Sequence, residues 1–176
     1  MLFFVILDIM PKALEKSPFY SQGLNFSCIR CSACCRYESG FVFLSQKDVL
    51  VIEKALNMKH PEFIQTYCRW ISSVNNTCQL ALKEKTNFDC IFWTDKLKEG
   101  QIQEENIEEG CSIYNARPLQ CRAFPFWAAV VCDKESWEMT AKDCPGMGQG
   151  VLHSRDSIEK WLALRQNEPI MSKGVF

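Results

Sequence analysis

Apolar residues along the chain fall into short segments, and one of the clearest has helical spacing. An apolar stripe runs from Val49 to Leu56, directly after Ser45 and Asp48, which stand three positions apart. A hydroxyl residue followed three positions later by an acidic one is typical of a capped helix N-terminus. The pattern therefore predicts a helix that begins after Ser45 and ends near Asn57.

A second apolar stripe with helical spacing, from Phe63 to Trp70, follows Pro61. Proline is tolerated in the first turn of a helix, so we predict a second helix that extends to about Ser72. Before the first helix, the continuous apolar run 41–44 predicts a short buried strand.

Two pairs of apolar segments are separated by short polar stretches and predict β-hairpins. The first pair is 78–82 and 90–93, on either side of a polar turn. The second pair is 130–132 and 137–140, on either side of a short polar segment. Residues 95–110 are rich in charge and predict a loop.

The length and charge of the chain limit the classes of function. With 176 residues the chain is long enough for one domain with a buried core and too short for two full domains. Lys and Arg total 20 against 21 Asp and Glu, which gives a formal net charge of −1. This balance lacks the excess of positive charge that binds a phosphate backbone, so we expect no nucleic-acid partner.

Cysteine is the unusual residue type, with 11 in the chain, an odd number that cannot pair completely. Disulfides would need an oxidising compartment, but the apolar segment from Met1 to Met10 lacks basic residues, contains Asp8 and has no A-x-A cleavage site. The segment is shorter than the ~20 residues of a membrane-spanning helix, and Met10 is an equally suitable start. We therefore expect a cytoplasmic protein with reduced thiols and no membrane partner, in which metal binding is favoured over disulfides.

Four of the thiols lie close together, in the motif Cys28-x-x-Cys31-x-x-Cys34-Cys35. Two-residue spacers let a turning backbone direct successive sulfurs to one centre, as iron–sulfur and zinc sites both do. Adjacent residues do not easily present both sulfurs to one compact centre, so Cys34 and Cys35 are predicted to face two sites or one multinuclear site. An iron–sulfur cluster, of the 4Fe–4S type, and zinc or iron ions remain open as the bound group.

The predicted ligand set is completed by four cysteines that stand beside turn residues, Pro, Gly or Arg: Cys90, Cys111, Cys121 and Cys144. Cys144 precedes Pro145, as one ligand of an iron–sulfur cluster often does. Three others, Cys68, Cys78 and Cys132, fall within predicted helices or strands, where a cysteine is more often a small buried apolar residue. The eight ligands suit two tetrahedral zinc ions, or a four-iron cluster and a second centre.

Near its end the chain has one more helical pattern, which Ser154 or Asp156 would begin and Pro169 would close. No repeat or linker interrupts the sequence. We predict a small α+β domain in which short helices and β-hairpins surround an irregular, cysteine-rich metal-binding core. Its parts are an N-terminal extension, the cysteine-cluster metal-binding domain, and a C-terminal helix and tail packed on that domain, at residues 1–25, 26–150 and 151–176.

Other residues beside the cysteines have two interpretations. Arg30, Arg117 and Arg122 would either offset thiolate charge or form surface salt bridges. The glycine-rich segment after Cys144 is interpreted as a tight turn whose amides approach a sulfur. Five aromatic residues near the cysteines are interpreted as core residues, with a water-excluding shell around a cluster as the second interpretation: Phe92, Trp93, Phe124, Phe126 and Trp127.

The joint order of these motifs resembles the YkgJ-type cysteine-cluster proteins, also described as CxxCxxCC zinc- or iron-chelating domains. The likeness extends over roughly residues 26 to 150 and is carried by the segments 26–35, 111–114, 117–126 and 144–150. The chain departs from the usual pattern at Ser32, where Gly often precedes the second pair of cysteines.

The resemblance implies a bacterial or archaeal protein that chelates iron, zinc or an iron–sulfur cluster, in a group where most activities are unassigned. Some members are labelled oxidoreductases, and a related cysteine arrangement in flagellin lysine N-methylases implies a methyltransferase link for part of the group. Two functions follow. The first, which we favour because no acid–base pair stands out in the sequence, is a metal-binding module for metal handling or for structure and interaction with a protein partner. The second is an iron–sulfur redox enzyme or a cluster-assisted transferase, with catalytic residues that the sequence does not identify.

Overall fold

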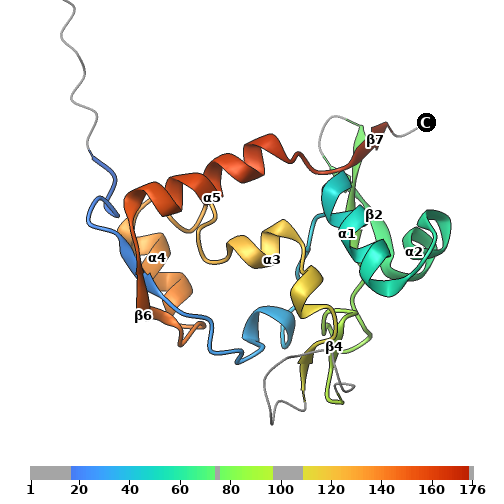
Figure 1. Cartoon of the computed structure of the whole chain (residues 1–176), viewed down its shortest axis with the longest axis horizontal. Coiled ribbons are helices and arrows are strands. Elements are labelled where there is room, and N and C mark those ends of the chain that lie inside the picture. The colour runs from blue at the N-terminus through green and yellow to red at the C-terminus, as the bar shows by residue number, and fades with distance from the viewer. Residues whose placement is uncertain (1–16, 74–75, 97–108, 175–176) are drawn as a thin grey trace, which may run out of the picture.

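Two separate groups of buried side chains form the interior, one in each half of the molecule (Figure 1). The structure is a computed structural model and describes residues 17–73, 76–96 and 109–174. The predicted N-terminal extension therefore lies largely outside the described residues, as does most of the predicted loop 95–110.

The first half packs two helices against a three-stranded antiparallel sheet (Figure 1). The helices are α1 (Gln46–Leu56) and α2 (His60–Tyr67). The strands, in their order across the sheet, are β2 (Cys68–Ser73), β3 (Thr77–Leu82) and β7 (Ser172–Gly174). Leu44, Ile52, Phe63 and Leu80 are fully buried in this core, because the apolar faces of both helices meet the sheet.

The second half contains a two-stranded antiparallel sheet and two helices. They are β1 (Leu24–Phe26), β6 (Met147–His153), α4 (Lys134–Ala141) and α5 (Arg155–Asn167). The Phe26 ring meets the Phe126 ring edge to face at 6.1 Å between centroids, and the Phe126 ring stacks on Trp137 at 6.3 Å. Helix α5 runs from this half along one side of the molecule toward the first, and β7 follows it (Figure 1).

Short elements between the two halves carry most of the predicted ligands. They are η1 (Ala33–Cys35), β4 (Trp93–Thr94), β5 (Gly110–Cys111), η2 (Tyr114–Ala116) and α3 (Leu119–Ala123). Figure 1 shows α3 in the middle of the molecule, with the light-blue turn of η1 below it. The architecture is the predicted small α+β domain.

The predicted helix caps are confirmed. The Ser45 hydroxyl oxygen accepts a hydrogen bond of 3.1 Å from the Asp48 N–H, and the Asp48 carboxylate accepts one of 2.9 Å from the Ser45 N–H. Helix α1 ends before Asn57, which has a left-handed φ of 52°. Helix α5 begins after Ser154, whose hydroxyl oxygen accepts from the Ser157 N–H.

The predicted second helix is wrong in its last part. Helix α2 ends at Tyr67, and the chain continues directly as β2. Strands β2 and β3 pair in continuous antiparallel register, from Cys68 opposite Leu82 to Ser73 opposite Thr77. This pairing between consecutive strands overrides the helical spacing of the apolar residues.

The first predicted hairpin forms only at its turn. Glu84 and Cys90 make one antiparallel bridge, but the segment 78–82 pairs with β2 and β7. The apolar run 41–44 is extended along the same sheet, where the Leu44 N–H donates a hydrogen bond of 3.0 Å to the Leu80 carbonyl oxygen. A single bridge at Phe43 replaces the predicted strand.

The second predicted hairpin is wrong, because its second segment lies in helix α4. The Asp133 carboxylate accepts a hydrogen bond of 2.7 Å from the Ser136 N–H and so caps the first turn. Trp137 then faces the second core, with an exposed fraction of 7%. The polar segment interpreted as a hairpin turn is in fact a helix start.

Candidate metal centre

The CxxCxxCC motif follows β1 and reverses direction twice through left-handed backbone. Arg30 has a φ of 57° and Ser32 a φ of 62°, and the chain then enters the single turn of η1, which carries Cys34 and Cys35. A residue with a side chain rarely adopts this conformation, whereas Gly adopts it readily. The left-handed φ at Ser32 therefore explains why Gly suits this position of the motif.

A turn after Cys90 surrounds its sulfur with backbone amides. The Trp93 N–H donates to the Cys90 carbonyl oxygen at 2.9 Å, and the N–H groups of Phe92 and Trp93 both donate to the Cys90 sulfur. Strands β4 and β5 then pair Trp93 with Cys111. The Cys111 sulfur in turn accepts from the Ile113 N–H.

The same turn recurs at Cys144 in the other half. The Met147 N–H donates to the Cys144 carbonyl oxygen at 3.0 Å, and the N–H groups of Gly146 and Met147 donate to the sulfur. This confirms the predicted turn whose amides approach a sulfur, although the later glycines lie in strand β6. Amide donors favour the negatively charged thiolate, which is the form that binds a metal.

Helix α3 places Cys121 and is fixed by the first half of the molecule. The Leu119 N–H at its start donates a hydrogen bond of 2.6 Å to the Asp48 carboxylate of α1. Leu119 is fully buried. The buried acid that caps α1 thus also orients the helix that carries Cys121.

Five of the eight predicted ligands, which we call the five-thiol cluster, interact electrostatically: Cys34, Cys35, Cys90, Cys111 and Cys121. Cys34 takes part in each of these interactions. Its sulfur lies 3.7 Å from that of Cys35. Both adjacent thiols therefore interact with the same group of sulfurs.

Burial and mutual repulsion set the charge of this cluster. Burial raises the pKa of Cys90, Cys111 and Cys121, and neighbouring thiolates act in the same direction at all three. The pKa of Cys111 is raised to about 11 in all. The thiol of Cys35 donates toward Cys34, which lowers the pKa of Cys34 to about 7 and raises that of Cys35. At neutral pH, therefore, the free cluster holds one partly ionised thiol among neutral ones.

The other three predicted ligands are Cys28, Cys31 and Cys144. Cys144 interacts electrostatically with Cys31 and Cys34, which connects the second half to the motif. Cys28 and Cys31 are exposed. Within the described ranges, no three His, Cys, Asp or Glu side chains are close enough together to hold a metal ion as they stand.

Arginine side chains lie beside the cluster, which supports the interpretation that they offset thiolate charge. Arg117 lowers the pKa of Cys34, Cys111 and Cys121 by its charge, although burial or the Cys35 contact acts more strongly at each. Its guanidinium carbon lies 3.6 Å from the centre of the Tyr114 ring. Arg122 instead donates to the Arg117 carbonyl oxygen at 3.0 Å and so supports the loop.

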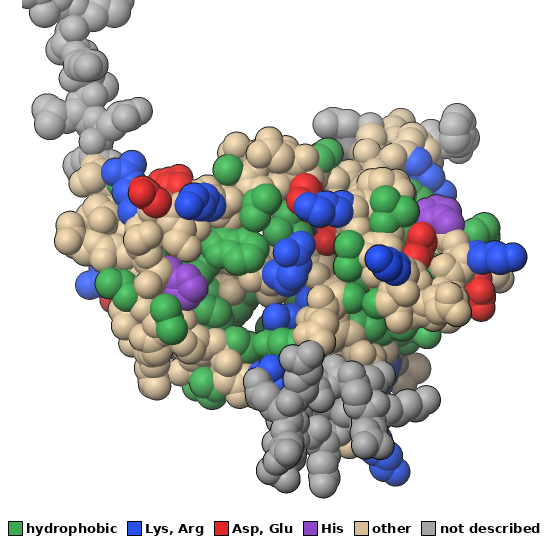
Figure 2. Space-filling view, viewed as in Figure 1, with side chains coloured by type: hydrophobic (Ala, Val, Ile, Leu, Met, Phe, Trp, Pro, Cys, Tyr) green, Lys and Arg blue, Asp and Glu red, His purple; other side chains and the backbone are tan. Residues whose placement is uncertain are grey.

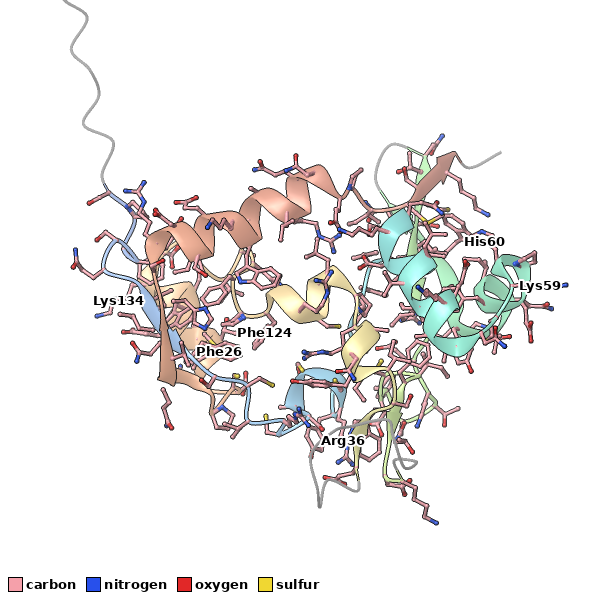
Figure 3. The ribbon with its side chains drawn as sticks, in the orientation of Figure 1. Phe26, Arg36, Lys59, His60, Phe124 and Lys134 are labelled. Carbon is pink, nitrogen blue, oxygen red and sulfur yellow. The ribbon has the colours of Figure 1, made fainter. Side chains whose placement is uncertain are left out.

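A second cation lies on the aromatic side of the cluster. The guanidinium carbon of Arg36 is 3.8 Å from the centre of the Trp93 ring, and its Nε is 3.6 Å from the buried Asp89 carboxylate. Figure 3 shows Arg36 near the lower edge, beside η1, and the Phe26 and Phe124 rings on the other side of the central region.

The three cysteines excluded from the ligand set occupy different environments. Cys68 is buried in the first core, with an exposed fraction of 5%, as predicted for a small apolar residue. Cys78 is half-buried in β3. Cys132 is exposed, contrary to the expectation, because its segment is the start of α4 rather than a strand, and its thiol donates to the Ala129 carbonyl oxygen at 3.2 Å.

The fold and the gathered thiols define a small cysteine-cluster protein of the α+β class. The chain belongs to the family described as "CxxCxxCC: Putative zinc- or iron-chelating domain", whose model matches residues 27–145, more than half of its length. The resemblance seen in the sequence is therefore confirmed.

The chain is also similar to the uncharacterized protein MJ0661 of Methanocaldococcus jannaschii, with 29% identity over 122 residues. The match covers 69% of this chain and 56% of MJ0661, so the chain spans about half the length of that relative. No solved structure matches. Across the described residues, no helix is both long enough and apolar enough to cross a membrane.

Proposed function

We propose that the chain binds zinc or iron, the latter as ions or as an iron–sulfur cluster, through the eight cysteines that the sequence predicts. The observation that carries the proposal is that Cys34, Cys90 and Cys121 line one cavity, with the Cys35 sulfur 3.7 Å from that of Cys34. Backbone N–H groups are directed at the sulfurs of Cys90 and Cys111. Thiolates are the ligands of choice for both metals. The family description names the same two metals, zinc and iron.

The five-thiol cluster is the primary centre in this proposal. Four sulfurs suffice for a tetrahedral zinc ion or for a 4Fe–4S cluster, and the fifth allows a multinuclear site. Cys28, Cys31 and Cys144 extend the donor set on the side of the second half. A bound metal supplies positive charge, and Arg117 offsets part of the remaining thiolate charge.

The proposed role is that of a metal-binding module in metal handling, or in structure and interaction with a protein partner, in a reducing compartment such as the cytoplasm. The ligands of the five-thiol cluster come from four separate segments of the chain: η1, the turn at Cys90, β5 and α3. Because a metal would join these segments, its binding contributes directly to folding, by an amount of about 10 kcal/mol for a structural zinc site.

Elemental analysis of protein purified without oxygen tests the proposal. We expect stoichiometric zinc, or iron with acid-labile sulfide, and a large loss of thermal stability after a chelator removes the metal. Protein that contains none of these, or that keeps its full melting temperature after chelation, would contradict a structural metal centre. Zinc in colourless protein would exclude the iron–sulfur form.

The second candidate is an iron–sulfur redox enzyme or a cluster-assisted transferase, of the oxidoreductase or protein lysine methylase type. One observation favours it: three thiols of the cluster line a cavity. A reducible paramagnetic signal from anaerobic protein would support this candidate over the first.

A further inference from the structure

A cavity of about 220 Å³ adjoins the five-thiol cluster. Cys34, Cys90 and Cys121 line one part of it. Most of the remaining wall is apolar and is formed by Phe41, Val42, Leu82, Phe88, Phe124 and Trp127. We propose that this cavity binds a small aromatic molecule that carries one soft donor atom, such as a thiol sulfur, directed at the cysteines; the donor's role rests on the proposed metal binding.

Three of the four charged or amide side chains that line the cavity, Gln120, Glu84 and Lys83, bond to the protein, and the fourth is Glu38. The Gln120 amide oxygen accepts from the Phe43 N–H at 2.9 Å, and its nitrogen donates to the Phe41 carbonyl oxygen at 2.7 Å. The Glu84 carboxylate accepts from the Gly40 N–H at 2.6 Å and also pairs with Arg69. These contacts leave ring faces and aliphatic groups as the main surface offered to a ligand, which favours an apolar body over a charged one.

The indole of Trp127 is held in a fixed orientation at the cavity wall. Its N–H donates a hydrogen bond of 2.8 Å to the Gln120 carbonyl oxygen, which fixes the ring at the cavity wall. The Phe124 ring packs edge to face against it, with 5.2 Å between centroids. A flat ligand would meet rings that are already held in place, so little side-chain freedom would be lost on binding.

Two exposed rings belong to the cavity lining. Phe41 and Phe88 have exposed fractions of 46% and 54%. Phe88 has a φ of 68°, a left-handed conformation that a bulky residue rarely adopts. A large aromatic side chain at a position better suited to Gly or Asn, and exposed at a cavity, is consistent with a ring that contacts a ligand.

The size of the cavity limits the ligand. Pockets for drug-sized molecules measure about 300–1,000 Å³, whereas one water occupies about 30 Å³. The cavity therefore suits a body of one or two rings. Thiolate-bound zinc or iron favours a further sulfur donor over a hydroxyl, which sets the chemistry of the ligand's polar end.

Calorimetric titration of the full chain with three probes tests the proposal. Benzyl mercaptan has both the ring and the thiol, benzyl alcohol has only the ring, and 2-mercaptoethanol has only the thiol. We expect metal-loaded protein to bind benzyl mercaptan at least tenfold more tightly than either of the others. Metal content is measured before and after each titration, so that loss of metal to the probe is detected.

Variants identify the place of binding. Phe88→Ala should weaken benzyl mercaptan binding several-fold, whereas Leu50→Ala, which removes a side chain of similar exposure from α1, should not. Equal affinity for the three probes, or no effect of Phe88→Ala, would overturn the proposal. Equal affinity for benzyl mercaptan and benzyl alcohol would overturn the role given to the soft donor atom. Protein that never contains metal would instead show that the proposed function fails.

Discussion

The backbone N–H of Cys90 donates a hydrogen bond of 2.8 Å to the carbonyl oxygen of Cys35. This contact joins the end of the CxxCxxCC motif to the turn that directs two amides at the Cys90 sulfur. The two cysteines are distant in the sequence, so their contact assembles a site that neither segment contains alone. The arrangement of ligands is thus set by backbone pairing as well as by the motif.

The first prediction concerns Cys90, which takes part in this contact, and Cys121. Replacement of Cys90 or Cys121 by Ser should lower bound zinc or iron strongly, because a hydroxyl is a poor ligand for either metal in a thiolate site. The control is Cys132→Ser, since Cys132 is exposed at the start of α4. Equal metal content in the control and in both cluster variants would contradict the assignment.

The second prediction concerns pH and metal affinity. Burial raises the pKa of Cys111 to about 11 and raises that of Cys121, so these thiols are protonated at neutral pH and must release protons to bind a metal. Affinity should therefore rise with pH, by about tenfold per unit for each proton released. Competition with a coloured chelator between pH 6 and pH 8.5 measures the slope, and a flat profile would contradict it.

The metal-free protein should show a related effect on stability. A thiol whose folded pKa is raised contributes stability that is present below its unfolded pKa and is lost as the pH rises through the folded pKa. For Cys111 that window begins near the ordinary pKa of 9.0 and extends to about 11. Chemical unfolding of metal-free protein should therefore show declining stability above pH 9. Cys34, with its pKa lowered to about 7, acts in the opposite direction as the pH falls.

Parts of the fold could be predicted because their signals are local. Ser45 and Asp48 satisfy the first N–H groups of α1 from three residues apart, and Ser154 does the same for α5. The helix–strand transition at Tyr67 could not be predicted in this way, because β2 is stabilised by pairing with β3, and the apolar spacing of residues 63–70 alone does not report that pairing. Asp133 is a cap of the same local kind, but the apolar residues around it suggested strands.

In the candidate site, too, the features with a local signal could be predicted and the others could not. The spacing of the motif predicts that its cysteines bind metal, and the turn after Cys144 was recognised from its glycines. The grouping of the thiols could not be predicted, because it depends on the contact between Cys35 and Cys90 and on the placement of α3 by Asp48. The cavity was missed for the same reason, since its walls come from several separate segments.

The third prediction concerns the charge beside the cluster. Arg117→Gln removes a cation that lowers the pKa of three thiols, so it should weaken metal binding by about tenfold, at the lower end of the range for groups that support metal ligands. Arg117→Lys should retain part of the effect. Arg155→Gln is the control, because Arg155 pairs with Glu159 on α5. Loss of affinity in the control alone, or in neither variant at position 117, would contradict a role for this charge.

The fourth prediction uses the left-handed backbone at Ser32. Because Gly adopts a φ of 62° without steric cost, Ser32→Gly should stabilise the protein by about 1 kcal/mol, whereas Ser32→Ala should not. Ser72→Gly is a suitable control, since Ser72 lies in β2, where Gly destabilises a strand by a similar amount. Denaturant unfolding of the metal-loaded variants measures the differences. Equal loss of stability in both Gly variants would contradict the strained conformation.

The last prediction concerns Asp48, which connects the fold to the site. Its carboxylate accepts hydrogen bonds from the Ser45 N–H and from the Leu119 N–H, and its side chain is buried. Asp48→Ala leaves buried donors without their acceptor, so we expect a loss of about 2–4 kcal/mol, against about 1 kcal/mol for Ser154→Ala at the exposed cap of α5. Because α3 would also lose its anchor, metal affinity should fall in Asp48→Ala and stay unchanged in Ser154→Ala. Unfolding curves and metal titrations of the two variants separate these effects, and a stability loss without any change in metal affinity would show that Cys121 is placed by other contacts.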